Sequence, residues 1–434
     1  MNYQETCEYL YHQLPMFERQ GKAGYKEGLS NTWALDAHFG HPHTQFTTIH
    51  VGGTNGKGSV SHTLAAILQK CGYVVGLYTS PHLADFRERI RVNDKMIPEG
   101  YVVDFVERER TFFEPLSPSF FELTTALAFK YFADKQIDIA VIEVGLGGRL
   151  DCTNIITPVV SVITNISFDH TQFLGDTLAK IASEKAGIIK PTIPVVVGES
   201  HEETRPVFEK RAQEVGSKIV FADDNPEILT ANPIAYGRMH YTTRHWGELD
   251  GDLGGIYQEK NLNTVFATLE VLAEKELFSQ YTQQQFRKIL ADSLREVCKL
   301  TGLTGRWQVV NQFPYTVCDT GHNVGGWVYL SQQIAQVDCQ KKHIIFGMVD
   351  DKDINHVLEM LPKDACYYFT QATNKRAIQG TTVKEQAIQY GLTGECYLSV
   401  KEAYKAAQRA ATPNDFIFIG GSSYLVGDFL KNCI

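Results

Sequence analysis

A lysine among glycines is the first group in this sequence suited to chemistry. Lys57 lies in the loop GGTNGKGS at residues 52–59, after a β-branched run at 47–51 and before a helical apolar pattern at 59–72. In such a strand–loop–helix segment, backbone N–H groups and the positive helix end bind phosphate, and the lysine reaches its outer oxygens. We predict a nucleotide site here, with a solvated glycine-rich turn as the alternative. Its residues are Gly53, Thr54, Asn55, Gly56, Lys57, Gly58 and Ser59.

Gly58 follows the lysine directly, where phosphate loops usually carry a serine or threonine that ligates the metal. The metal ligands must therefore lie elsewhere in the chain. Ser80, Glu143 and His170 each lie at or just beyond the end of an apolar, β-branched run. Because α/β sheets bind ligands at the carboxyl ends of their strands, these three groups predict a Mg²⁺ site. The alternatives are a salt bridge for Glu143 and a core position for His170.

Lys185 lies on the apolar side of a predicted helix. In GDTLAKIASEKAGIIK, residues 175–190, it follows Leu178, Ile181 and Ala182 at helical spacing. Burial favours the neutral amine, which is nucleophilic. Such an amine can take up CO₂ as a carbamate and so become a metal ligand. The alternative is a lysine whose ammonium group reaches past the apolar stripe into water.

A second group of polar residues lies in the last third of the chain. The segment VCDTGHN, residues 317–323, puts Asp319, His322 and Asn323 just beyond a strand, and Arg306 lies shortly upstream. We expect these groups to face the first domain across a cleft, which is a common place for ligands. Helix capping by Asp319 or Asn323 is the alternative.

Alternating apolar runs and helical patterns would position these groups. They predict an α/β protein with a P-loop parallel-sheet ATPase domain at 1–299 and a smaller Rossmann-like α/β C-terminal domain at 300–434. The aromatic and glycine-rich stretch at 235–260 predicts a small hairpin region. The predicted strand runs are TTIHV (47–51), VVGLYTS (74–80), IDIAVIEVG (137–145), PVVSVITNI (158–166), IPVVVGE (193–199), YTVCDTGHN (315–323), HIIFGMV (343–349), CYYFTQ (366–371), CYLSV (396–400) and DFIFIGG (415–421).

The totals exclude several classes of protein. The chain has 434 residues, is 43% apolar and carries a formal charge of −9, which does not suit binding to a nucleic-acid backbone. No segment reaches the roughly 18 apolar residues that a membrane span needs. The nine cysteines are scattered without a CxxC pair, as in proteins with reduced thiols. We expect a cytoplasmic monomer without nucleic-acid or membrane partners.

Basic residues nevertheless gather locally and suggest small anionic ligands held in a cleft. For the arginine run in ADFRERIRVN alone, a solvated charged loop is the alternative. The basic residues in question are Lys57, Arg87, Arg89, Arg91, Arg149 and Arg306.

In this order, the motifs resemble those of the folylpolyglutamate synthase and dihydrofolate synthase family of Mur-type ATP-dependent amide ligases. The resemblance covers nearly the whole chain, and the phosphate loop of that family also has glycine after the lysine. About fifty residues precede the loop, which we interpret as too few for the uridine-nucleotide domain of cell-wall Mur ligases. The matching segments are GGTNGKGS, TSPHLADFRERIRVN, SFFELTTALAF, EVGLGGRLDCTN, NISFDH, SEKAGIIK, QEKNLNT, GRW, DTGHN, FGMVDDKD and GGSSYLVG.

The resemblance implies ATP and Mg²⁺ as cofactors and assigns roles by motif. Ser80, Glu143, His170 and a carbamylated Lys185 would hold the metal. Asn261, Arg306 and Asp319 would contact ATP together with the phosphate loop, and His322 would lie near the reacting centre, with Lys57 and Lys185 also catalytic. The implied pteroate pocket comprises Gly28, Leu29, Phe86, Arg89, Ser119, Phe120, Phe121, Glu122, Leu150, Asp151 and Cys152. Ser30 and Asn31 depart from the acidic-arginine pair common in that family.

The implied reaction joins L-glutamate to dihydropteroate, to folate polyglutamates, or to both. The substrate carboxylate attacks the γ-phosphoryl group of ATP, and the glutamate amine then displaces phosphate from the acyl phosphate. Two other functions stay open: a Mur-type ligase acting on a cell-wall or other amino-acid conjugate, and a nucleotide-gated binding protein without ligase activity. Glutamate-dependent release of ADP separates the last from the ligases.

Overall fold

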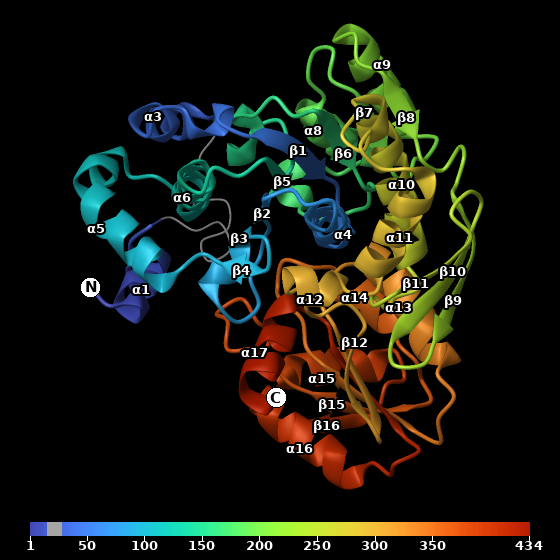
Figure 1. The fold of residues 1–434 in the computed structure, drawn as a ribbon. Coiled ribbons are helices and arrows are strands. Elements are labelled where there is room, and N and C mark those ends of the chain that lie inside the picture. Colours follow the sequence, from blue (N-terminus) through green and yellow to red (C-terminus); the bar gives the residue numbers. More distant parts are fainter. Residues whose placement is uncertain (15–27) are drawn as a thin grey trace.

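The computed structural model describes residues 1–14 and 28–434, which form three β-sheets surrounded by helices. An eight-stranded sheet occupies the first half of the chain and a six-stranded sheet the last third. Figure 1 shows the six-stranded sheet and its helices, orange to red, below the larger sheet. The helix α4 (Lys57–Lys70), which follows the phosphate loop, lies near the junction of the two parts. The fold is α/β with a second α/β part, as predicted.

The eight-stranded sheet has the order β4-β3-β2-β5-β1-β6-β7-β8 and is parallel from β2 to β8. Its edge strands β3 and β4 are antiparallel and were not predicted, and neither was β8, because each has only two or three residues. The strands are β1 (Thr47–Gly52), β2 (Val75–Tyr78), β3 (Ile90–Val92), β4 (Lys95–Met96), β5 (Ile139–Glu143), β6 (Val160–Ile163), β7 (Val195–Val197) and β8 (Ile219–Phe221).

Both faces of this sheet are buried, which explains its continuous apolar strands. In β5, Ile139 and Val141 pack with α4 and α10, whereas Ala140 and Ile142 pack on the opposite face with α5 and α6. None of the described helices combines the length and apolar content that a membrane span requires. The helices of this part are α1 (Tyr3–Gln13), α3 (Ser30–His38), η2 (Pro42–Thr44), α4, η3 (Phe86–Arg89), α5 (Glu99–Leu116), α6 (Phe120–Asp134), η4 (Cys152–Ile155), α7 (Thr171–Leu174), α8 (Leu178–Lys185), η5 (Ala186–Ile188), α9 (Arg205–Glu214), α10 (Gln258–Glu274), α11 (Gln283–Leu294) and α12 (Val297–Thr301).

The predicted hairpin region is larger than expected. The strands β9 (Ile228–Ile234), β10 (Arg238–Thr243) and β11 (Glu248–Gly251) form a three-stranded antiparallel sheet in the order β11-β10-β9. The strand β9 lies almost wholly before the predicted window, and most of its residues are exposed. It therefore lacks the apolar alternation by which a strand is recognised in sequence.

The six-stranded sheet has the order β12-β13-β17-β14-β15-β16, with only β12 antiparallel to its neighbour. The predicted strand CYLSV is wrong in position. The strand β16 ends at Cys396, and the Ser399 side chain accepts a hydrogen bond from Glu402 N to begin a helix. The elements are β12 (Gln308–Gln312), β13 (Tyr315–Asp319), α13 (Val324–Gln336), β14 (Lys342–Phe346), α14 (Ile354–Met360), β15 (Ala365–Phe369), α15 (Gly380–Gln389), β16 (Gly394–Cys396), α16 (Val400–Ala410), β17 (Phe416–Gly420) and α17 (Ser423–Cys433).

The connection between the two larger sheets runs through α12, which packs against α4 of the first part. The first strand of the second sheet starts at Gln308. The domain limits 1–299 and 300–434 stay a prediction.

Two buried histidines should make the stability of the first part depend on pH. Burial lowers the pKa of both His50 and His62 from 6.5 to about 3. Below pH 6.5 the unfolded chain therefore binds protons that the folded chain does not, so stability falls as the pH drops from 6.5 towards 3. Each histidine should contribute about 1.4 kcal/mol per pH unit to this slope.

The measurement is the free energy of unfolding in urea between pH 7 and pH 5. The quantity to compare is the change in the free energy of unfolding per pH unit. We expect this slope to be smaller in His62→Leu than in the wild type by the contribution of about one histidine. In the double variant His50→Leu/His62→Leu it should be smaller by the contribution of about two. Equal slopes for the wild type and both variants would contradict the assignment.

Candidate active site

A cavity of about 320 Å³ lies between the two parts of the chain. It opens at the carboxyl ends of the strands of the larger sheet, where α/β proteins bind ligands. All the residues predicted to bind ATP, to hold the metal or to act in catalysis line it. They are Gly53, Thr54, Asn55, Gly56, Lys57, Gly58, Ser59, Ser80, Glu143, His170, Lys185, Asn261, Arg306, Asp319 and His322.

The phosphate loop is held open by two glycines with positive φ, Gly53 at 136° and Gly56 at 83°. A Cβ atom at Gly53 would collide with Thr164, and one at Gly56 with the side chain of Asn261. The loop also receives support from β6, because Thr54 N donates to Asn165 O at 2.9 Å. Only glycine fits these positions, and the helix α4 then begins at Lys57 with its N–H groups facing the cavity.

Gly58 makes room for the second part of the chain. A Cβ atom at this position would lie 3.2 Å from Nη2 of Arg306, closer than side chains ordinarily pack. Serine or threonine, usual after a phosphate-loop lysine, would therefore crowd the guanidinium group. Arg306 can approach the phosphate loop this closely because Gly58 has no side chain.

Lys57 lies inside the cavity, with its Nζ donating to Thr54 O at 2.9 Å. Burial lowers the pKa of the Lys57 ammonium, and the nearby carboxylate of Glu143 opposes that shift. Burial in turn raises the pKa of Glu143, against the effect of Lys57. The two groups stabilise each other's charged forms in a site that disfavours charge.

The residues predicted to hold Mg²⁺ come together at the ends of adjacent strands. Glu143, the last residue of β5, accepts a hydrogen bond from Ser80 N at 3.1 Å, and Glu143 is only 3% exposed. A buried carboxylate next to a hydroxyl is an oxygen donor set of the kind that Mg²⁺ prefers. His170 precedes α7, and burial lowers its pKa to about 3, so its ring is neutral and able to ligate. The set fits a divalent cation.

Lys185, the last residue of α8, points into the protein as its spacing predicted. It is 5% exposed, and its Nζ donates to Gly53 O of the phosphate loop at 2.8 Å. Burial, and secondarily the charge of Lys57, lower the pKa of Lys185 to about 7. A substantial fraction of the amine is therefore neutral near pH 7. The alternative of an ammonium group in water is wrong.

Asp169 connects the two parts of the chain. Its carboxylate pairs with Lys352 and accepts from Asn323 Nδ2 at 3.0 Å, while His322 Nε2 lies 3.6 Å away. Burial alone would raise the pKa of Asp169, but the ammonium group of Lys352 holds it well below its usual range. Asn323 also exchanges two hydrogen bonds with the side chain of Asn55, at 2.9 and 3.1 Å.

Asp319 organises the second part's side of the cavity. Its carboxylate accepts from Trp307 N at 2.7 Å, Gly321 N at 2.8 Å and the Tyr257 hydroxyl at 2.5 Å. Burial raises its pKa despite these donors and the nearby Arg306. Asp319 ends β13 and caps no helix. Asn323 does cap α13, since its side chain accepts from Gly326 N at 2.9 Å, so the capping alternative is confirmed for Asn323.

One wall of the cavity contains seven of the predicted pteroate residues. Ser119 and Glu122 form a capping box that begins α6, with Ser119 N donating to Glu122 Oε2 at 2.6 Å. Asp151 accepts from Leu146 N at 2.8 Å, and burial raises its pKa. The seven are Ser119, Phe120, Phe121, Glu122, Leu150, Asp151 and Cys152.

The other four predicted pteroate residues do not line the cavity. Phe86 is 2% exposed in the core, and Leu29 packs against the same cluster just after Gly28. Arg89 is buried too; its guanidinium lies 5.1 Å from the ring centroid of Phe120, and Nε donates to His82 at 2.7 Å. Arg89 is therefore placed to position Phe120, and direct contact of these four residues with substrate stays a prediction.

The arginine run does not line the cavity, so contact of these arginines with an anionic ligand stays a prediction. Arg87 pairs with Asp85 and Arg91 lies 8% exposed beside Gly302, so with the buried Arg89 the run neither faces the cavity nor forms a solvated loop. The exposed Arg149 pairs with Glu184 at 2.9 Å. Of the arginines and lysines in that basic group, only Lys57 and Arg306 line the cavity, together with three basic residues that were not predicted, Lys260, Lys352 and Arg376.

Lys352, Arg376 and the other unpredicted lining residues do not belong to a sequence motif that by itself indicates a chemical role. Lys352 follows β14 in FGMVDDKD, at the carboxyl end of a buried strand, so the rule that found Ser80 and Glu143 would also have found it. Arg376 lies in a loop after β15 and pairs with Asp351. The lining residues not predicted include Glu199, Tyr257, Lys260, Tyr329, Asp351, Lys352 and Arg376.

Comparison with known proteins decides the family. Residues 51–261 match the Mur ligase middle domain, and residues 305–423 match the Mur ligase glutamate ligase domain. The folylpolyglutamate synthase of Lacticaseibacillus casei is 36% identical over 363 residues, 81% of each chain. The chain belongs to the folylpolyglutamate synthase/dihydrofolate synthase family. It is an ATP-dependent ligase of the Mur type, as predicted.

Solved structures of this family cover nearly the whole chain. The Escherichia coli FolC protein in complex with DHPP and ADP superimposes with a TM-score of 0.82 at 29% identity, covering 99% of this chain and 97% of that one. The bifunctional folylpolyglutamate synthase/dihydrofolate synthase of Yersinia pestis, complexed with AMPPNP and a Mn ion, gives 0.79 at 27% identity and covers 98% and 97%. These complexes support ATP and a divalent metal as ligands of the family.

Proposed function

We propose that this chain joins L-glutamate to dihydropteroate or to a reduced folate through an acyl phosphate, with release of ADP and phosphate. The observation that carries the proposal is a single cavity lined by the phosphate loop, the buried Glu143, the wall around Phe120 and Phe121, and cationic groups of the second part. A nucleotide and an organic acid would therefore bind side by side in one cavity. Relatives named for this activity support the assignment.

In the first step, an oxygen of the pterin substrate's carboxylate attacks the γ-phosphorus of ATP, and the bond to ADP breaks. The N–H groups at the start of α4 bind the phosphates, and Lys57 and Arg306 balance negative charge on the transferred group from opposite sides. Ser80, Glu143 and His170 would hold Mg²⁺, which supplies further charge stabilisation when bound. The closed contacts of Asp169 with the second part keep water from the acyl phosphate.

In the second step, the amine of glutamate attacks the acyl carbon and phosphate leaves. The attacking nitrogen must lose a proton. His322 lines the cavity on the second part's side; its Nδ1 donates to Thr320 O at 3.0 Å, and its Nε2 lies 3.6 Å from the Asp169 carboxylate. We assign the proton acceptor role to His322 Nε2.

Carbamylation of Lys185 belongs to the same proposal. A pKa of about 7 provides the neutral amine that CO₂ requires, and the carbamate replaces a buried cation beside the phosphate loop by an anion that can ligate the metal. The lysine is thereby converted from a group that repels Mg²⁺ into one that binds it.

The carboxylates of L-glutamate need cationic partners on the second part's side of the cavity. Lys352 and Arg376 line that side, and their side chains are only 7% and 15% exposed. Each now pairs with a carboxylate of the protein, Asp169 or Asp351. We propose that the glutamate carboxylates bind between these two cations.

Lys352→Met should therefore raise the KM for L-glutamate by about ten-fold or more, since charge-assisted hydrogen bonds contribute about 1.5–3 kcal/mol. The Kd for ATP should change by less than about two-fold on this basis. Lys384→Met is the matched control, because Lys384 pairs with Glu395 outside the cavity. An unchanged KM for glutamate in Lys352→Met would contradict the assignment.

The experiment that tests the function is ADP release with dihydropteroate or tetrahydrofolate, each with and without L-glutamate. We expect release that requires both the pterin substrate and glutamate. Release with only one of the two pterins identifies the step that the enzyme performs. ATP binding without glutamate-dependent release would favour a nucleotide-gated binding protein, and activity only with uridine-nucleotide substrates would favour a cell-wall ligase.

A further inference from the structure

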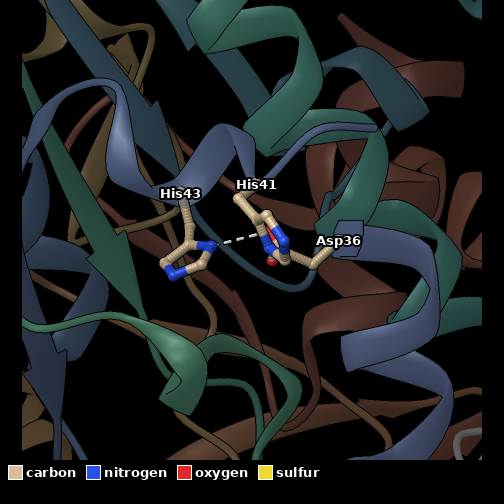
Figure 2. A group of neighbouring side chains, drawn as sticks. All are labelled: Asp36, His41 and His43. Carbon is tan, nitrogen blue, oxygen red and sulfur yellow. Dashed lines mark hydrogen bonds and ion pairs between the residues drawn. The ribbon is translucent and has the colours of Figure 1, made fainter. Parts of the chain in front are cut away.

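A group of two histidines and one aspartate lies outside the cavity described above. Asp36 lies near the end of α3, and His41 and His43 lie in the following turn and in η2. His41 Nδ1 is 2.7 Å from Asp36 Oδ2, and His43 Nδ1 is 2.7 Å from Asp36 Oδ1. Figure 2 shows the two imidazole rings gathered around the carboxylate. None of the three residues lines the active-site cavity.

The turn that brings the histidines to Asp36 is tightly fixed. Gly40 and His41 both have positive φ, 74° and 56°, and His41 N donates to Asp36 O at 2.8 Å. Pro42 is buried, and Thr44 Oγ1 donates to His41 O at 2.8 Å. A histidine with positive φ is uncommon, and such positions often hold a functional group in place. The ligand atoms are therefore brought together by the backbone.

We propose that Asp36, His41 and His43 form a binding site for a divalent transition-metal ion of the Zn²⁺ type. Their three ligand atoms all lie within 4.8 Å of one another. Two imidazoles and one carboxylate are the donors that Zn²⁺, Ni²⁺ and Co²⁺ take in proteins, whereas Mg²⁺ and Ca²⁺ prefer oxygen alone. Three protein ligands leave a further coordination position for water.

The geometry requires only a small adjustment to admit the ion. Bonds from Zn²⁺ to histidine nitrogen and carboxylate oxygen are about 2.0–2.2 Å, so each N···O pair must widen from hydrogen-bonding distance by roughly half an ångström. Asp36 is the fixed member, with its side chain 3% exposed, and His41 is the mobile one, at 58%. Each neutral ring can carry its proton on Nε2 instead of Nδ1, which frees the Nδ1 lone pair for the metal and leaves the imidazole in the neutral form that ligates metals.

The site would join α3 to the segment that enters β1. The strand β1 leads directly into the phosphate loop, and α3 packs against α6, which carries the cavity residues Phe120 and Phe121. An ion bound here adds three bonds between these segments. Because the ion binds the folded chain, it should raise the unfolding temperature of the protein in a concentration-dependent way.

Trp33 provides a local reporter for the test. Its ring meets that of His43 edge to face, with centroids 5.6 Å apart, and Trp33 is 44% exposed. We would titrate the full-length protein with Co²⁺ and follow its visible absorption and the tryptophan fluorescence, which a paramagnetic ion quenches at short range. Thiolate-to-cobalt absorption in the near ultraviolet identifies any binding at the nine free cysteines.

His41→Gly is the decisive variant, because glycine suits the positive φ at this position and should leave the fold intact. We expect it to weaken Co²⁺ and Zn²⁺ binding by at least about ten-fold, to abolish the quenching and to remove the metal-dependent rise in unfolding temperature. Trp33→Phe should bind one equivalent without the fluorescence change.

His240→Gln is the matched control, since His240 also contacts two carboxylates, Asp250 and Glu248, but has no second histidine among its partners. It should bind the metal like the wild type. Equal affinity and stoichiometry in the wild type and His41→Gly would overturn the proposal and leave the group as a hydrogen-bonded clamp. A wild-type protein that binds Co²⁺ only through thiolates would overturn it as well.

Discussion

Lys57→Ala should lower kcat by about 100-fold or more, the usual effect of removing a group that stabilises transition-state charge. The reason is position: the ammonium group lies in the cavity at the start of α4, close enough to the buried Glu143 and to Arg306 for their charges to influence it. The measurement is steady-state ADP release with saturating pterin substrate and glutamate.

The fold of Lys57→Ala should be unchanged, because the hydrogen bond that Lys57 makes in the structure is to Thr54 O of its own loop. Lys70→Ala is the control: Lys70 ends the same helix and pairs with Glu296 at the surface. Activity of Lys57→Ala close to that of Lys70→Ala, with equal unfolding temperatures, would remove Lys57 from the mechanism.

Lys185→Ala should also lower kcat by about 100-fold or more, because the carbamate would help to hold the Mg²⁺ that stabilises the negative charge of the transition state. Short carboxylic acids such as acetate should restore part of the activity, because they place a carboxylate in the space that the side chain leaves. Lys185→Met should be equally inactive and should not respond to acetate, since methionine fills that space. Lys180→Ala, on the exposed side of the same helix, should be fully active.

A direct measurement of the carbamate is ¹³C NMR of the enzyme in ¹³C-bicarbonate. The signal should be present in the wild type and absent from Lys185→Met. It should increase as the pH rises through about 7, because only the neutral amine reacts with CO₂. Rescue of both variants by acetate, or of neither, would contradict the carbamate.

Much of this site follows from the rule that parallel strands bring ligands to one edge of a sheet. Ser80, Glu143 and His170 were placed together because each ends or follows a buried run, and Lys185 because its apolar neighbours recur at helical spacing. Both signals are local. A buried strand or helix can be recognised from the pattern of apolar residues within a window of about 11–18 residues.

Contacts between distant segments gave no such signal. The approach of Arg306 to Gly58 depends on how the second part meets the first, and no window of sequence contains both. Lys352 belongs to a strand end that was recognised, but its partner Asp169 lies 183 residues away. The short edge strands β3, β4 and β8 and the exposed β9 likewise depend on pairing with neighbours rather than on a pattern of their own.

The contact between Arg306 and Gly58, the glycine after the phosphate-loop lysine, has a consequence for the use of ATP. If the two parts separate, the phosphate loop loses the guanidinium group that lies beside Gly58. On the proposed mechanism, we therefore expect an opened molecule to break down bound nucleotide more slowly than the closed one. A residue without a side chain would in this way tie the use of ATP to assembly of both parts around the reactants.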